Sequence, residues 1–185
     1  MLNKKMVNVI HKINEFKTAW RENASMRFLL WVIVSFFIWN VIYYEFLIDS
    51  VVSVMLTEHL ADTTVFFLRF FGYTTWRVET SIYLEHIQAV NIGNACNGLD
   101  FFGVFSCFVF TFPAPLKHKV WLFVAGLACI HILNIVRLIL LPIIYISSPD
   151  TFDFNHKYTF VIVIYGVLFF LWFSWAKKYR SPDYA

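Results

Sequence analysis

Long apolar runs with at most one charged residue each set the strongest constraint on this fold. A helix crosses the hydrocarbon core of a bilayer, about 30 Å thick, with about 20 mostly apolar residues. Four runs approach or reach that length: residues 28–46, 99–112, 120–144 and 158–176. The 59% hydrophobic content lies well above that of soluble domains, which excludes an ordinary soluble fold. The sequence therefore predicts an all-α polytopic membrane protein with four transmembrane helices.

The ends of two runs refine this prediction. The second run is short and aromatic, and it stops at Pro113 and Pro115, where proline ends a helix. The first run continues into Glu45 and Asp49, whereas a cleaved signal peptide has a shorter apolar core followed by small residues. We therefore expect the first run to be a retained membrane anchor.

Basic residues indicate the orientation, because lysine and arginine flanks favour the cytoplasmic side. They outnumber acidic residues in residues 1–27, in the loop with Lys117 and Lys119, and in the tail after residue 176. Acidic residues are in excess in the alternate segments 49–97 and 148–157. Both termini are therefore expected in the cytoplasm. This topology accounts for the net charge of +3 without a nucleic-acid partner.

The same pattern divides the chain into three parts. Residues 1–27 form a cytoplasmic amphipathic segment, with apolar residues at helical spacing among lysines, as in a helix on a membrane face. Residues 28–176 form the membrane domain, and residues 177–185 a cytoplasmic tail. Within the membrane domain, the outer segment 49–97 is expected to begin with apolar helical pieces broken at Asp62 and Gly72. It is expected to end with a small β-hairpin, because β-branched and aromatic residues alternate there.

Polar side chains at the ends of spans mark a candidate site, because an ionisable residue inside a bilayer costs about 2.5 to 3.5 kcal/mol. Cys96 precedes the second span and His156 the fourth. Arg137 lies 17 residues after Val120, which is about 26 Å along the third helix. Three helices thus bring a thiol, an imidazole and a guanidinium to the outer face at similar depth.

These three groups suit nucleophilic catalysis. A thiolate is the reactive form of cysteine, and a helix N-terminus and a cation both favour it. Cys96 is thus a candidate nucleophile and His156 a general acid and base that passes a proton to a leaving amine. Arg137 stays protonated, so it serves as a stabiliser of the thiolate or of an oxyanion. Each of these residues alone is explained by a purely structural role. The placement of all three at one face and at similar depth favours catalysis.

Other polar residues are expected to support this site. Asn134 lies one turn before Arg137, and Gly98 provides a tight turn into the second helix. Asp100 follows Cys96 by four residues, so we expect it one helical turn deeper on the same face. There it either pairs with Arg137 or orients His156, and a structural salt bridge with Arg137 is the favoured alternative.

The remaining histidines and cysteines are expected to be structural. His131 is expected to be a buried polar partner. Cys107 and Cys129 are expected to be unreactive packing residues within the hydrocarbon. His59 and His86 have no ligand spacing, so neither a metal site nor a cofactor is predicted.

The segments "ACNGLDFF" and "HILNIVRLILLP", followed by His156 before the last span, resemble the exosortase and archaeosortase family over residues 70–176. The resemblance implies a Cys-Arg-His transpeptidase or protease in the plasma membrane of a prokaryote. Its substrates would be exported proteins with a C-terminal sorting signal, made of a short motif, a transmembrane helix and a basic cluster. The new carboxyl end would pass to an acceptor that the sequence does not identify. The four spans resemble the compact branches of the family, and Asp100 matches no family role.

Two other functions compete with this one. A thiol-disulfide oxidoreductase would carry paired cysteines such as Cys-x-x-Cys, which the chain lacks, and Cys96 and Cys107 are about 16 Å apart along a helix. A non-enzymatic membrane assembly or transport subunit would use Arg137 and Asp100 as a structural ion pair.

Overall fold

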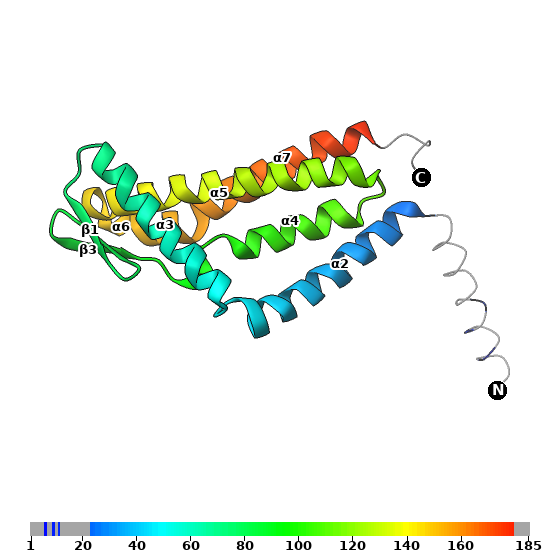
Figure 1. Cartoon of the computed structure of the whole chain (residues 1–185). Helices are drawn as coiled ribbons and strands as arrows, with labels where there is room; N and C mark the ends of the chain where they lie inside the picture. Colours follow the sequence, from blue (N-terminus) through cyan, green and yellow to red (C-terminus); the bar gives the residue numbers. More distant parts are fainter. Residues whose placement is uncertain (1–5, 7–8, 10, 12–22, 180–185) are drawn as a thin grey trace.

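The computed structural model describes residues 6, 9, 11 and 23–179, and these residues form a helical molecule with one small sheet (Figure 1). Four helical stretches in this part of the chain are long and apolar enough to cross a membrane: Ser25–Leu47, Val51–Phe70, Leu116–Ser147 and Pro149–Lys178. The predicted class, an all-α polytopic membrane protein with a small extramembrane insertion, is confirmed. Most of the expected amphipathic segment and of the tail lies outside the described residues.

The elements follow one another with short connections. Helix α2 (Ala24–Ile42) continues through a π-helical turn, η1 (Tyr43–Leu47), and helix α3 (Val51–Phe70) follows. Three strands come next, β1 (Thr75–Val78), β2 (Ser81–Leu84) and β3 (Ile87–Asn91), and then a 3-10 turn, η2 (Asn94–Cys96). The rest of the chain comprises α4 (Leu99–Thr111), α5 (Leu116–Ser147), α6 (Pro149–Phe154), η3 (Asn155–Thr159) and α7 (Phe160–Lys178).

Prolines end and begin these helices as expected. Helix α4 stops at Thr111, two residues before Pro113, and Pro115 is the N-cap of α5. The last helical stretch begins earlier than predicted, because α6 and the π-helical turn η3 precede α7 without a break. His156 therefore lies on a helix and not in a loop.

Two apolar clusters stabilise the molecule, one at each end. At the sheet end, α3, β2, β3 and the last part of α5 bury aliphatic side chains that include Leu60, Leu68, Ile82, Leu84 and Leu138. At the opposite end, α4, α5 and α7 bury a second set: Phe101, Phe105, Val109, Leu122, Ile130, Ile164 and Leu168. Helix α5 belongs to both clusters and runs the length of the molecule (Figure 1).

Helix α3 corrects the prediction for the outer segment. It is one unbroken helix of 20 residues, not pieces divided at Asp62. Asp62 interrupts nothing because it lies on the exposed face of α3, where Arg77 of β1 binds its carboxylate with an Nη2–Oδ2 distance of 2.9 Å. The four helices of spanning length therefore include α3, whereas α4, expected to be a span, has only 13 residues, about 20 Å of helix.

The sheet also differs from the expected hairpin. Its three strands are antiparallel in the order β1-β2-β3, with Thr75 opposite Leu84 and Ser81 opposite Asn91. The turn from β2 to β3 places Glu85 and His86 at positive φ, 49° and 71°. Such turns usually contain Asn-Gly or Asp-Gly, so the sequence carries no local signal for this second hairpin.

Close packing of α2 on α4 generates a stability prediction. A Cβ atom at Gly103 would lie 1.7 Å from Cε2 of Trp39, so Gly103→Ala forces α2 away from α4. Overpacking of this kind costs about 1 to 3 kcal/mol. We expect the purified variant in detergent to unfold at a lower temperature than the unsubstituted protein.

Gly166→Ala is the matched control. Among the described residues, nothing outside the adjacent turns of α7 lies within 4 Å of a Cβ placed there, and alanine is the better helix former. This variant should unfold at or above the original temperature. Equal unfolding temperatures for the two variants would contradict the packing described for α2 and α4.

Candidate active site

Cys96 is held at the end of η2, just before α4. Its amide donates a hydrogen bond to the carbonyl oxygen of Gly93, 2.8 Å away. Two residues later, Gly98 adopts a left-handed conformation with φ of 86°, which glycine accepts at little cost. A Cβ at Gly98 would also approach Nδ2 of Asn134 to 3.3 Å. The predicted tight turn at Gly98 is therefore present, and Cys96 is left half-buried.

The other two predicted catalytic side chains meet at this sulfur. Nε2 of His156 lies 3.7 Å from Sγ of Cys96. Nη2 of Arg137 donates to the same sulfur from 3.9 Å, and the Arg137 side chain is buried with 5% of its surface exposed. The three residues come from η2, η3 and α5, so the tertiary fold alone brings them together.

Asn134 fixes the cysteine from the side of α5. Its Nδ2 donates to the carbonyl oxygen of Cys96 at 3.0 Å, and the side chain is fully buried. Nε of Arg137 and Oδ1 of Asn134 are buried atoms without a hydrogen-bond partner within the described residues. Unpaired buried polar atoms are costly, so this part of the site holds polar groups whose hydrogen-bonding capacity the packing leaves unused.

The chain matches the model of one protein family, the transmembrane exosortases, over residues 23–175. This chain belongs to the transmembrane exosortase family. The match covers most of the chain and includes Cys96, Arg137 and His156, and it confirms the family predicted from the sequence. Neither a curated protein nor a solved structure matches the chain.

Asp100 of this exosortase does not form the expected salt bridge. No ion pair with Arg137 is present among the residues that the structure describes, and the carboxylate faces Trp39 of α2. The indole Nε1 of Trp39 makes no hydrogen bond of normal geometry. The prediction placed Cys96 and Asp100 on one helical face, but the left-handed turn at Gly98 breaks the register between them.

The exosortase also contains a histidine pair that the sequence did not predict. His131 of α5 stacks on His59 of α3, with ring centroids 5.7 Å apart and planes at 11°. His131 was expected to be a buried polar partner, but it is half-buried, and its ring contact is with an exposed histidine 72 positions away. Within the described part of the chain, no group of three or more side chains could hold a metal ion.

Sequence reasoning missed the contacts that hold the cysteine turn on α3. Asn97 is buried, and its Nδ2 donates to Oγ of Ser53 at 2.8 Å and to Oγ1 of Thr57 at 3.3 Å. Its Oδ1 accepts from the amide of Leu99 at 2.9 Å, which gives the first amide of α4 a partner that the helix itself does not supply. The available signal was the spacing of Ser53 and Thr57, which form a polar stripe on an apolar helix.

Replacement of Asn97 tests this anchoring. Asn97→Asp keeps the shape but removes both donor hydrogens and turns a carboxylate toward the carbonyl oxygen of Ser53, which accepts from Asn97 at 3.2 Å. The loss of buried hydrogen bonds, with a charge left unsatisfied, should lower the free energy of unfolding by about 2 kcal/mol or more. Chemical denaturation in detergent measures this change.

Asn91→Asp provides the control. Asn91 is exposed and only accepts, through Oδ1, a hydrogen bond from Thr80 at 3.1 Å, so aspartate retains that contact. This variant should be as stable as the unsubstituted exosortase. Equal losses in the two variants would show that Asn97 does not anchor the turn.

Proposed function

We propose that this exosortase is a membrane-embedded cysteine transpeptidase or protease that cleaves C-terminal sorting signals of exported proteins. The observation that carries the proposal is the position of the Cys96 sulfur, 3.7 Å from Nε2 of His156 and 3.9 Å from Nη2 of Arg137. A nucleophile, a proton carrier and a fixed cation are the groups that acyl transfer from a peptide requires.

The first half-reaction forms a thioester. His156 accepts the proton of the Cys96 thiol, and the thiolate attacks the carbonyl carbon of the scissile peptide bond. Arg137 stabilises the negative charge that develops on the carbonyl oxygen. The carbon-nitrogen bond then breaks, and the leaving amine takes the proton from His156. The substrate's new carboxyl end is now joined to the sulfur.

The second half-reaction releases this end. An acceptor nucleophile, or water, loses a proton to His156 as it attacks the thioester carbonyl. Collapse of the second tetrahedral intermediate breaks the carbon-sulfur bond, and the proton returns to Cys96. Attack by an acceptor gives transpeptidation, and attack by water gives hydrolysis.

The depth of the site supports action at a membrane surface. Arg137 follows Leu116 by 21 residues, which is about 32 Å along α5 and close to the thickness of the hydrocarbon core. Lys117 and Lys119 lie near the other end of α5, and Lys177 and Lys178 near the end of α7. Because basic residues beside a membrane span favour the cytoplasm, we infer that the site faces outward from a prokaryotic plasma membrane, with both termini inside.

The two competing functions have less support. An oxidoreductase would bring two thiols together, but Cys96, Cys107 and Cys129 are free cysteines. The assembly-subunit hypothesis depended on an ion pair between Arg137 and Asp100, and Asp100 faces Trp39 instead.

Substitution of the nucleophile tests the proposal. Cys96→Ala in the native host should cause exported proteins with the tripartite C-terminal signal to accumulate as uncleaved precursors. The cleavage rate should fall by at least about 10³-fold, as expected when a nucleophile is removed. Cys129→Ala is the control, because Cys129 lies on α5 away from this sulfur. If precursors are processed at the same rate in both variants, the proposed function is wrong.

Labelling of the thiol tests the orientation. A membrane-impermeant maleimide added to intact cells should label Cys96 and leave Cys107 and Cys129 unmodified, since only Cys96 is expected at the outer surface. Mass spectrometry of the cysteine peptides measures this. Labelling of Cys96 in inside-out vesicles but not in intact cells would place the site in the cytoplasm.

A further inference from the structure

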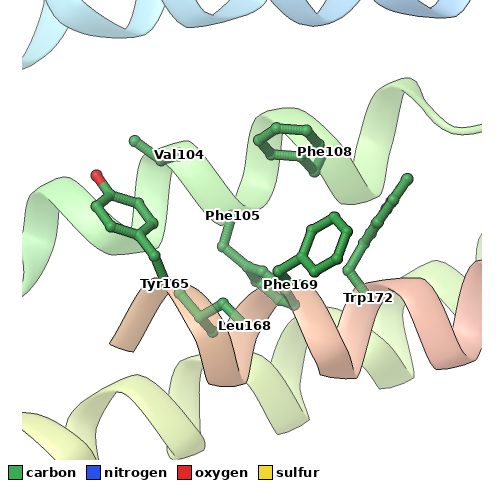
Figure 2. A pocket seen from close by; sticks show the side chains of 7 residues that line it. All are labelled: Val104, Phe105, Phe108, Tyr165, Leu168, Phe169 and Trp172. Atoms are coloured by element: carbon green, nitrogen blue, oxygen red, sulfur yellow. The ribbon is translucent and has the colours of Figure 1, made fainter. Parts of the chain in front are cut away.

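An apolar groove lies between α4 and α7. It has a volume of about 310 Å³, and its walls come from Val104, Phe105, Phe108, Tyr165, Leu168, Phe169 and Trp172. Figure 2 shows these side chains in the space between the two helices, with the ring of Tyr165 extending from α7 toward α4. Apart from the Tyr165 hydroxyl and the Trp172 indole nitrogen, the lining side chains are hydrocarbon.

The groove is aligned with the candidate active site. Helix α4 begins three residues after Cys96, and α7 continues the helical stretch that carries His156. Along the unbroken helical stretch η3–α7, Tyr165 follows His156 by 9 residues and Trp172 follows it by 16, so the groove extends from about 14 to about 24 Å beyond His156. The two helices that present the nucleophile and the imidazole therefore also form its walls.

The groove opens sideways, toward the bilayer. Phe105 and Leu168 form its floor with 3% and 4% of their surfaces exposed. Phe169 and Tyr165 are at its rim, 63% and 41% exposed. Because α7 belongs to a helical stretch of spanning length and α4 beside it is a shorter apolar helix, an occupant enters from lipid and must be apolar.

We propose that this groove binds large apolar side chains of the membrane-embedded substrate segment that follows the scissile bond. A substrate whose scissile peptide bond lies at Cys96 continues beyond that bond into the membrane. A segment inside hydrocarbon is helical, because its backbone groups must form hydrogen bonds with one another. At 1.5 Å per residue, the side chains that reach the groove come from about 9 to 16 residues after the scissile bond. The inference depends on the proposed function, and it adds the position in the substrate that is recognised.

The size of the groove selects this occupant. About 310 Å³ is too small for a whole helix, so the groove receives side chains from one helical face, three or four residues apart. A lipid acyl chain is the competing occupant. It would place its headgroup at the level of Cys96 and obstruct the substrate.

The first experiment compares two neighbouring phenylalanines on α7. Phe169 lines the groove and Phe170 does not, although both are largely exposed, at 63% and 71%. The substrate is a precursor that accumulates in Cys96→Ala cells. Phe169→Ala should raise KM by about tenfold with little change in kcat, as for a lost contact in an apolar pocket, and Phe170→Ala should change neither. Equal effects of the two substitutions would overturn the inference.

The second experiment locates the contact without catalysis. Phe169→Cys is introduced into a protein in which Cys96, Cys107 and Cys129 are replaced by Ala, and single cysteines are placed 4 to 20 residues after the cleavage point of the precursor. Oxidation should give disulfide crosslinks that peak about 13 residues after that point, because Phe169 follows His156 by 13 residues. Phe170→Cys should give weak crosslinks without a peak.

The outcomes separate the two proposals. Cys96-dependent cleavage without a crosslink peak at Phe169→Cys refutes the groove as the substrate site and leaves lipid as its occupant. Cleavage that persists in Cys96→Ala refutes the proposed function, whatever the crosslinks show.

Discussion

The position of the Cys96 sulfur depends on a hydrogen bond from Asn134 of α5 to the carbonyl oxygen of Cys96, 3.0 Å long. Arg137 follows on the same helix one turn later, so the bond fixes the distance between the sulfur and its cation. Gly98 makes the approach possible, since any side chain there would crowd Asn134 in a backbone conformation that favours glycine. The rest of the site is built around this contact, with Asn97 holding the other side of the turn on α3.

Helix α5 explains why a polar site persists in so apolar a chain. One of its ends packs in the aliphatic cluster with the sheet and α3, and the other in the aromatic cluster with α4 and α7. The polar residues Asn134 and Arg137 lie between the two clusters, at about the thickness of the hydrocarbon core from the start of the helix. Two rigid apolar regions thus hold buried polar groups in place, which favours chemistry that needs fixed charges.

The sequence predicts the site better than its surroundings. Cys96 and His156 lie at the ends of apolar runs and Arg137 lies about 26 Å along another, so distances along the spans place them at one depth, and the structure brings all three together. The contacts of Asn97 with Ser53 and Thr57 join residues about 40 positions apart, so the polar stripe on α3 does not reveal its partner. The error at Asp100 has a local cause, because a helical spacing was applied across Gly98, where the helix has not begun.

A covalent thioester on Cys96 is the central claim, and mass spectrometry of the purified exosortase tests it most directly. After incubation with a precursor that accumulates in Cys96→Ala cells, the peptide containing Cys96 should carry the mass of the substrate up to its cleavage point. Hydroxylamine should remove that mass, because it cleaves thioesters. A substrate adduct on another residue, or cleavage of the precursor by Cys96→Ala protein, would contradict the account.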